Sequence, residues 1–206
     1  MILLVHCSPA TLERHRHPAL GVLSSPRTYY RRSEGIENWR WAADNDAYSD
    51  WNPDRYRRML DELAGLNGCL FVTAPDVVGD WQTTLERFGR WVGPLHELGL
   101  PIGYVLQDDQ PADLVPWDDL AAVFVGGTDH WKMGEPAREL VDEATRRGLW
   151  VHMGRVNGHR RLRYAKAIGC DSVDGTSLSW FRDHYLGAFL EHAVSKDVQL
   201  LLKAET

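Results

Sequence analysis

The sequence predicts an α/β fold, a compact (β/α) barrel of the TIM type, and three observations support this prediction. Short runs rich in β-branched and aromatic residues recur along the chain, and most lead into a polar loop and an amphipathic helical pattern. Such alternation predicts parallel strands joined by crossover helices. No glycine-rich phosphate-binding motif follows any of these runs, so the usual signals of a nucleotide-binding open sheet are missing.

Seven segments are predicted to be strands. They are residues 2–6, 39–45, 69–76, 102–108, 121–127, 149–154 and 170–175. The predicted helices are Pro53 to Ala64, Trp81 to Leu98, Pro136 to Arg147 and His159 to Ile168. Asn52 directly precedes Pro53 and is a typical N-cap residue. A barrel and an open doubly wound sheet both bury parallel strands on two faces, and we favour the barrel.

A full eightfold barrel typically needs about 250 residues, whereas this chain has 206. We therefore expect one compact domain over residues 1–206, in which the last unit is irregular or incomplete. Residues 8–38 show little periodicity and are predicted to form a long loop carrying the basic stretch RTYYRR at 27–32. The segment from Trp180 to Thr206 is predicted to be helical and to close the barrel.

Composition limits the classes of protein that the chain can belong to. The formal net charge of −6 argues against a protein that coats nucleic acid, although local arginine clusters can still contact phosphates. The apolar N-terminal run is too short for a signal peptide or a membrane span, so we expect a soluble cytoplasmic protein. Cys7, Cys69 and Cys170 include no CxxC pair and indicate neither a disulfide framework nor a zinc site. A homodimer is compatible with the sequence.

Polar residues mark the predicted strand ends, where TIM barrels gather their reactive groups. They are His6, Asp44, Asn45, Asp76, Gln107, Asp108, Gly126, Gly127, His152, Gly154, Arg155, Asp174 and Gly175. Two carboxylates that flank a glycosidic bond suit sugar transfer, one as nucleophile and one for proton transfer. Each residue also has an ordinary explanation, because an Asp can cap a helix, glycines can form turns, and His6 and His152 can orient or pack.

Taken in order, five segments resemble the tRNA-guanine transglycosylase superfamily over roughly residues 40–181. The segments are AADNDAYSD (42–50), APDVVGD (74–80), VLQDD (105–109), VGGTDHWKMGE (125–135) and HMGRVNGHRRLRYAKAIGCDSVDGTS (152–177). The first departs from the family's Asp-Ser-Gly-Gly-Phe, because Asn45 and Asp46 replace small residues. The short length resembles the phage branch of the family, whose members insert 7-deazaguanine bases into DNA.

The resemblance implies a reaction and a site. It implies that guanine in DNA is replaced by a 7-deazaguanine, such as 7-cyano-7-deazaguanine, through a covalent aspartyl-glycosyl intermediate. The nucleophile would be Asp174, and Asp44 would transfer the proton. The base-binding residues would be Asp76, Gln107 and a backbone N–H of Gly126 or Gly127.

The implied partners are guanine-containing DNA and a free 7-deazaguanine base, with no cofactor and no metal. The family's tRNA enzymes carry a C-terminal Cys/His zinc site, and nothing after Cys170 can supply one, so tRNA is the less favoured acceptor. Phosphate contacts are expected from Arg155, Arg160, Arg161 and Lys132, with further candidates in Arg163, Arg27, Arg31 and Arg32. Candidates for stacking on a base are Tyr48, Trp51, Tyr104 and Trp131. Solvated arginines and core aromatic residues are the plain alternatives.

Other functions stay open on the sequence. One is a tRNA-guanine transglycosylase acting on RNA, and another is a metal-dependent barrel hydrolase using His6, Asp76, His152 and Asp174, although no HxH or HExxH pair exists. A base-binding protein without turnover, or a glycosidase that only hydrolyses, is a third class. A further alternative is an N-terminal fragment of a larger modification complex, with an obligate partner at the RTYYRR stretch.

Overall fold

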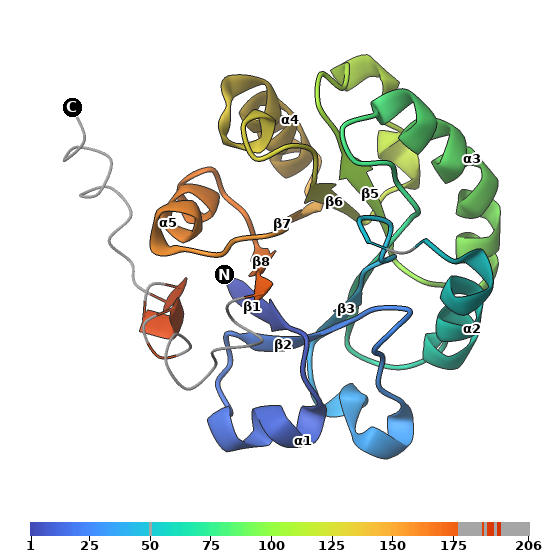
Figure 1. Cartoon of the computed structure of the whole chain (residues 1–206), viewed down its shortest axis with the longest axis vertical. Helices are drawn as coiled ribbons and strands as arrows, with labels where there is room; N and C mark the ends of the chain where they lie inside the picture. Colours follow the sequence, from blue (N-terminus) through green and yellow to red (C-terminus); the bar gives the residue numbers. More distant parts are fainter. Residues whose placement is uncertain (50, 177–186, 188, 192, 195–206) are drawn as a thin grey trace.

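The computed structural model is a closed barrel of eight parallel strands (Figure 1). It describes residues 1–49, 51–176, 187, 189–191, 193 and 194. The strands are β1 Ile2–Val5, β2 Leu20–Ser24, β3 Trp41–Ala43, β4 Cys69–Thr73, β5 Ile102–Leu106, β6 Ala122–Val125, β7 Trp150–Met153 and β8 Ser172–Asp174. They follow one another around the barrel in chain order, and β8 pairs with both β7 and β1. The predicted barrel is confirmed, and its last unit contributes a complete strand.

The prediction of one long loop over residues 8–38 is wrong, because this region contains β2. It also holds helix α1 (Pro9–Leu12) and the 3-10 turns Glu13–His15, Arg32–Glu34 and Ile36–Asn38. The sequence of β2, LGVLS, is a weak strand signal because Gly21 interrupts the apolar run. A Cβ atom at Gly21 would lie 2.7 Å from the carbonyl oxygen of Arg40, so the neighbouring strand requires the glycine that obscures β2.

The predicted helices are confirmed to within one or two residues. They are α2 Pro53–Leu63, α3 Trp81–Glu97, α4 Glu135–Arg146 and α5 His159–Ala167. Asn52 caps α2, since its side-chain oxygen accepts a hydrogen bond of 2.8 Å from the backbone N–H of Arg55. Between β5 and β6 the structure has only the 3-10 turns Ala112–Leu114 and Trp117–Asp119 in place of a helix. Another 3-10 turn, Trp131–Met133, precedes α4.

Alternation along the strands divides the core into two layers. Residues such as Leu3, Val5 and Val22 pack outward against the helices. A second cluster fills the interior of the barrel and consists of Ile2, Leu4, Leu23, Ala42, Phe71 and Ala122. The barrel is therefore plugged by side chains, as TIM barrels are, and does not form a pore. The inward positions beyond this plug, at the C-terminal ends of the strands, carry the polar residues.

Two further predictions concern the chain ends and the cysteines. Most of the predicted helix from Trp180 to Thr206 lies outside the described residues, and β1–β8 pairing closes the barrel. Within the described part, the ring of Phe189 packs against His159 with centroids 4.8 Å apart. Cys7 and Cys170 are buried, Cys69 is half-buried, and all three are free thiols. No helix in the described part of the chain is long and apolar enough to span a membrane.

Candidate active site

Asp174 ends β8 and receives hydrogen bonds on both carboxylate oxygens. His152 Nε2 lies 2.9 Å from Oδ2, and the backbone N–H of Arg155 donates to Oδ1 at 3.0 Å. An ionised carboxylate only accepts, so the proton of the first contact is on His152 Nε2. The other ring nitrogen, Nδ1, lies 2.8 Å from Ser172 Oγ. The indole N–H of Trp150 donates to the same oxygen at 2.8 Å. This chain of contacts holds the imidazole edge-on to the carboxylate.

These partners determine the charge of Asp174. Burial raises the pKa of its carboxyl group, but the hydrogen bond and charge of His152, the Arg155 N–H and the nearby His6 together lower it below the ordinary value. The side chain keeps 14% of its surface exposed. Asp174 is therefore an ionised carboxylate that reaches the open end of the barrel, which is the state that a nucleophile needs.

Asp44 follows β3, and its surroundings raise its pKa, whereas those of Asp174 lower the pKa of that residue. Burial, together with repulsion from Asp174 and Asp76, raises its pKa to about 7, and the hydrogen bond from the Asn45 N–H only partly offsets this. That N–H lies 2.7 Å from Asp44 Oδ1, and the Thr73 hydroxyl lies 3.4 Å from the same oxygen. A carboxyl group with a pKa near neutrality can both donate and accept a proton at physiological pH.

Asp76, beyond β4, is the centre of a buried hydrogen-bond network. Asn45 Nδ2 donates to Oδ1 at 2.9 Å, and Gln107 Nε2 donates to Oδ2 at 2.8 Å. Arg87 binds the backbone carbonyl of Asp76 at 2.7 Å. Burial raises the pKa of Asp76, and the two amide hydrogen bonds and Arg87 partly oppose this. Asn45, which replaces a small residue of the resembled motif, therefore has a defined task that the sequence did not reveal.

The glycine pair after β6 makes close contacts with the protein itself. A Cβ at Gly126 would lie 2.5 Å from Val105 Cγ1, and Gly127 has a φ of 61°. The N–H of Gly126 donates to the Leu106 carbonyl at 3.1 Å, and that of Gly127 donates to Gln107 Oε1 at 3.1 Å. The expected contact between one of these N–H groups and a base carbonyl requires a correction, because in this structure both bind protein oxygens.

Gln107 is fully buried. Both the oxygen and the nitrogen of its side-chain amide are hydrogen-bonded to other protein atoms. Its oxygen accepts from the backbone N–H of Gly79 at 2.9 Å as well as from Gly127, while its nitrogen binds Asp76. Its direct effect in the structure is to orient Asp76 and to join the loops after β4 and β6. Asp76 itself is 6% exposed, and a carboxylate has lone pairs beyond the two used here.

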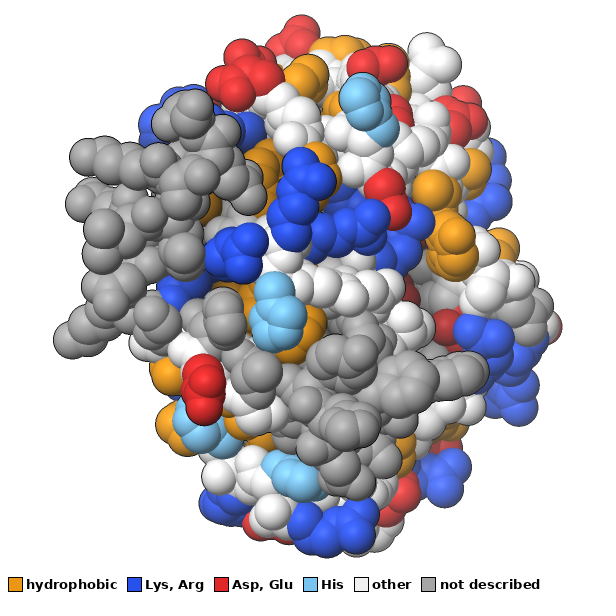
Figure 2. All heavy atoms as spheres, turned by 60° about the vertical axis from the view of Figure 1, so that its left-hand side comes forward, with side chains coloured by type: hydrophobic (Ala, Val, Ile, Leu, Met, Phe, Trp, Pro, Cys, Tyr) orange, Lys and Arg blue, Asp and Glu red, His pale blue; other side chains and the backbone are white. Residues whose placement is uncertain are grey.

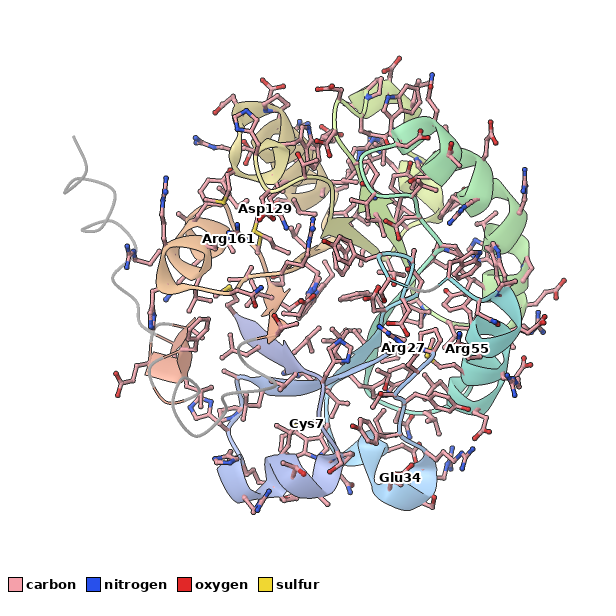
Figure 3. The ribbon with its side chains drawn as sticks, viewed as in Figure 1. Cys7, Arg27, Glu34, Arg55, Asp129 and Arg161 are labelled. Carbon is pink, nitrogen blue, oxygen red and sulfur yellow. The ribbon has the colours of Figure 1, made fainter. Side chains whose placement is uncertain are left out.

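Two of the expected phosphate contacts are corrected by the structure. Lys132 is 1% exposed, and its ammonium binds the Gly154 carbonyl at 3.0 Å and Asp129 Oδ1 at 3.3 Å. Arg161 of α5 binds Asp129 Oδ2 at 2.5 Å and lies beside it between α4 and α5 (Figure 3). Both cations thus share Asp129 as an acidic partner and also bind backbone or side-chain atoms of the protein. Burial lowers the pKa of Lys132 to about 8, with the Arg155 charge acting in the same direction.

Arg160 and Arg155 are the other two residues predicted to contact phosphates. Arg160 is exposed, and Arg155 is half-buried with its guanidinium on the Gly127 carbonyl and 5.0 Å from the ring centroid of Tyr48. Figure 2, in which the α5 side comes forward, shows Lys and Arg side chains gathered in a band across that face. The RTYYRR arginines instead have acidic partners. These pairs are Arg27–Asp46, Arg31–Glu62 and Arg32–Glu37.

The four aromatic residues predicted to stack on a base differ in their solvent exposure. Tyr48 is 70% exposed in the loop after β3. Trp51 is half-buried and packs against Tyr56 at a centroid distance of 5.4 Å. Tyr104 and Trp131 belong to the core between the strands and the helices, so the expectation that they stack on a base is wrong.

His6, at the end of β1, joins the site through the barrel's register. Leu4 pairs with Asp174 across β1 and β8, so His6, two residues further on the same face, lies just beyond the carboxylate. Burial lowers the pKa of His6, although the charges of Asp174 and Asp46 oppose this. The sequence predicts His6 at the mouth, and the pairing of Leu4 with Asp174 adds that His6 lies near this carboxylate.

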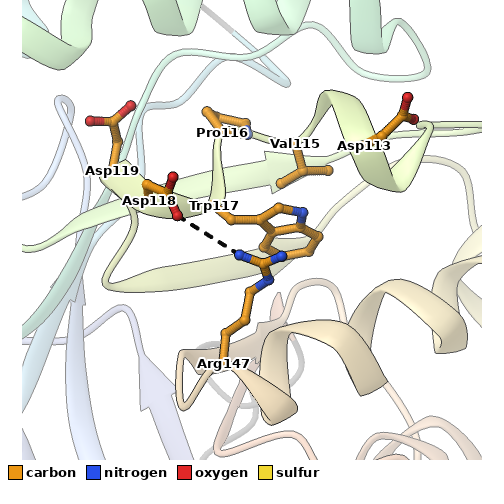
Figure 4. A pocket seen from close by; sticks show the side chains of 7 residues that line it. All are labelled: Asp113, Val115, Pro116, Trp117, Asp118, Asp119 and Arg147. Carbon is orange, nitrogen blue, oxygen red and sulfur yellow. Dashed lines mark ion pairs between the residues drawn. The ribbon is translucent and has the colours of Figure 1, made fainter.

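A surface pocket of about 300 Å³ lies away from this mouth (Figure 4). Its lining is Asp113, Val115, Pro116, Trp117, Asp118, Asp119 and Arg147. Arg147 lies over the Trp117 ring at 5.1 Å and 3.8 Å from Asp118. These residues precede β6 and β7, so they belong to the N-terminal end of the barrel, where conserved chemistry is not expected in TIM barrels. Within the described residues no three His, Cys, Asp or Glu side chains are grouped to hold a metal ion.

Comparison with known proteins shows the fold. No protein-family model matches the chain, and no curated protein matches it. Tryptophan synthase from M. tuberculosis, in an aminoacrylate- and BRD0059-bound form, is 13% identical with a TM-score of 0.58 over 94% of this chain and 92% of that chain. The YdjI aldolase from Escherichia coli K12 is 12% identical with a TM-score of 0.56, over 98% and 90%.

A third structure, native KDPGal, is 13% identical with a TM-score of 0.52 over 93% of this chain and 90% of that chain. At such identities the likeness shows a TIM-barrel fold that enzymes share, and it does not carry their reactions to this protein. The chemistry has to be argued from the side chains at the mouth.

Proposed function

We propose that this protein is a base-exchanging transglycosylase that replaces guanine in DNA with a 7-deazaguanine derivative. One observation carries the proposal. Two carboxyl groups at the barrel mouth, Asp174 and Asp44, have pKa values driven in opposite directions by their surroundings. In such a pair the ionised carboxylate can act as the nucleophile, and the carboxyl group with the raised pKa can act as the general acid and base. The resemblance of five ordered segments to the transglycosylase superfamily independently assigns these two roles to the same residues.

In the first half-reaction an Asp174 oxygen attacks C1′ of the target nucleotide. The C1′–N9 bond breaks, its electron pair leaves with guanine, and protonated Asp44 supplies the proton that neutralises the departing base. A covalent glycosyl ester on Asp174 remains. In the second half an incoming 7-deazaguanine gives its N9 proton to Asp44 and attacks C1′, which releases Asp174. The whole exchange breaks one glycosidic bond and forms another, so no cofactor is required.

Asp76 is the proposed anchor for the guanine edge. Its remaining lone pairs can accept from the N1–H and the exocyclic amino group of guanine, while Asn45 and Gln107 hold the carboxylate in place. Adenine has no such pair of donors, so it would leave a buried carboxylate poorly satisfied, at a cost of about 1–3 kcal/mol per unpaired group. A base within a duplex is out of reach, so the substrate is flipped or single-stranded.

Label incorporation tests the proposal directly. Purified protein without added metal is incubated with guanine-containing DNA or tRNA and radiolabelled guanine or 7-cyano-7-deazaguanine. We expect label to enter DNA with the wild type and not with Asp174→Asn, whereas Asp61→Asn on α2, remote from the mouth, behaves as wild type. Denaturing gels should also show a covalent protein–DNA adduct that requires Asp174.

The same assay separates the other functions. Entry of label into tRNA alone would shift the acceptor to RNA. Release of guanine without incorporation would identify a hydrolytic glycosidase, and tight base binding without either product would identify a binding protein. If no label enters any polymer and a chelator-sensitive hydrolysis appears, the transglycosylase proposal fails.

A further inference from the structure

The segment that presents an N–H group to Asp174 has an unusual backbone. Arg155, which donates that N–H at 3.0 Å, has a φ of 59°. A residue with a side chain rarely adopts this left-handed conformation and keeps it only where the surrounding structure holds it. The preceding residue is a glycine for a steric reason, because a Cβ at Gly154 would lie 2.5 Å from the Phe124 ring and 3.4 Å from Asp174 Oδ2. A side chain at Gly154 would therefore collide with the Phe124 ring and crowd the carboxylate.

Both carbonyl groups of this segment are held by cations from elsewhere in the chain. Lys132 Nζ donates to the Gly154 carbonyl at 3.0 Å, and Arg161 Nη1 donates to the Arg155 carbonyl at 3.1 Å. Asp129 joins the two cations, with Oδ1 3.3 Å from Lys132 and Oδ2 2.5 Å from Arg161 (Figure 3). One carboxylate in the loop after β6 thus fixes two donors that grip consecutive carbonyl groups.

We propose that Asp129, Lys132 and Arg161 form a clamp that holds the backbone N–H of Arg155 on Asp174. They are positioning residues, since they act through the peptide backbone and not on the reacting atoms. The role of Asp174 as nucleophile rests on the proposed function, whereas the clamp itself rests on the hydrogen bonds. The clamp accounts for two basic side chains whose sequence setting had suggested phosphate binding.

The burial of Lys132 supports this assignment. An ammonium group with 1% exposure is costly to bury and is found where it satisfies buried acceptors. Here it satisfies the Gly154 carbonyl, next to the strained residue, and it is paired with Asp129. A cation intended for a nucleic-acid phosphate would instead present its head group to solvent.

The decisive variant is Asp129→Ala, because two explanations predict opposite results. If Asp129 acted only through its charge, its removal would lower the pKa of Asp174 by removing a negative neighbour. If it anchors the clamp, the Arg155 N–H loosens and the pKa of Asp174 rises, because the carboxylate loses a hydrogen bond that favours its charged form. Titration of the ¹³C-labelled Asp174 carboxyl by NMR, assigned with Asp174→Asn, measures the direction without any activity assay.

Kinetics supply a second readout. We expect Asp129→Ala to lower kcat for base exchange about 10- to 100-fold with little change in KM, since misplacement of a reacting group has effects of this size. The acidic limb of the kcat/KM profile should move to higher pH. Arg161→Lys should act in the same direction, because one ammonium cannot span both the Arg155 carbonyl and Asp129 as a guanidinium does.

Two controls match these changes. Asp61→Ala removes an exposed carboxylate from a 2.9 Å pair with Arg57 on α2, and Arg163→Ala removes an arginine from the helix that carries Arg161. Both should leave the Asp174 titration unchanged. A pKa of Asp174 that falls or stays constant in Asp129→Ala and Arg161→Lys overturns the clamp. Failure of the wild type to exchange bases would instead reject the proposed function, and the titration would still decide on the clamp.

Discussion

The imidazole Nε2 of His152 lies 2.9 Å from Asp174 Oδ2, and the ring has no exposed surface. The rings of Phe71 and Phe124 pack against it, at centroid distances of 5.2 and 4.6 Å. A buried, aromatic-lined histidine thus holds the carboxylate that ends β8. This contact lowers the pKa of a group that burial alone would raise, so its removal has a predictable sign.

His152→Phe should preserve the packing and remove the hydrogen bond. The pKa of Asp174 then rises, since burial persists without its main compensation, and the carboxylate becomes protonated at a higher pH. We expect the acidic limb of kcat/KM for base exchange to move to higher pH, so that the rate falls more at pH 6 than at pH 8. His152→Gln, which keeps an N–H donor, should lose less. An unchanged acidic limb in His152→Phe would contradict the assignment.

Asp44 should give the basic limb of the same pH profile. Its proton is needed for departure of the base, so kcat/KM should decline as the pH rises above about 7, the pKa that its burial and carboxylate neighbours produce. In Asp44→Asn that limb should vanish, and the remaining rate should be about 10²- to 10⁴-fold lower. A normal basic limb in this variant would assign the titration to another group.

The same substitution should increase stability at high pH. The folded-state pKa of Asp44, about 7, lies above the ordinary value of 3.8, so the folded protein binds an extra proton between these values. Stability contributed by that proton is lost as the pH rises towards 7. We therefore expect Asp44→Asn to raise the free energy of unfolding by about 2 kcal/mol at pH 8 and by less at pH 5, measured by urea denaturation. A larger gain at pH 5 would contradict this sign.

Gly127→Ala should destabilise the protein more than a matched change elsewhere. Gly127 has a φ of 61°, and a Cβ there would lie 2.5 Å from Asp108 Oδ2 and 2.7 Å from the Trp131 ring. Gly148 has a φ of 72° with open space around it, so Gly148→Ala tests the backbone cost alone, about 1 kcal/mol. We expect Gly127→Ala to lose about 2–4 kcal/mol in chemical denaturation. Equal losses would show that the loop adapts.

Gln107→Glu should disturb the anchor of the base. The new carboxyl group would lie against Asp76 Oδ2, where the amide nitrogen now donates at 2.8 Å. Two such carboxyl groups cannot both ionise, so the pair would share a proton. We expect KM for the incoming base to rise about tenfold or more at pH 8 and to recover partly at pH 6. Steady-state kinetics with 7-cyano-7-deazaguanine provide the measurement, and a pH-independent KM would contradict the shared proton.

Salt dependence distinguishes a phosphate contact from a buried cation. Arg160 is exposed on α5, whereas Lys132 is 1% exposed and bound to Asp129. Arg160→Ala should reduce the slope of log Kd against log salt for single-stranded DNA by about one. Lys132→Met should leave that slope unchanged even if it weakens catalysis. Fluorescence anisotropy over a salt series measures both, and the opposite pattern would restore Lys132 as a phosphate ligand.

Most of the fold could be predicted from the sequence because its signals are local. Helical spacing and the Asn52 cap gave the bounds of α2 closely, and the same held for α3, α4 and α5. β2 was missed because Gly21 weakens the strand pattern, and the need for that glycine comes from the Arg40 carbonyl on the neighbouring strand. A steric requirement between strands leaves no recognisable trace in a single sequence.

For the site, the positions of polar residues after the predicted strands could be read along the chain, and parallel strands in a barrel bring those ends to one mouth. The contacts and charge of each residue at the mouth depend on how the chain folds. Burial and charge separate the pKa values of Asp44 and Asp174, and the contacts of Lys132 and Arg161 with Asp129 make them internal supports. These properties depend on partners from distant parts of the chain, and electrostatic energy follows distance in space, not separation in sequence.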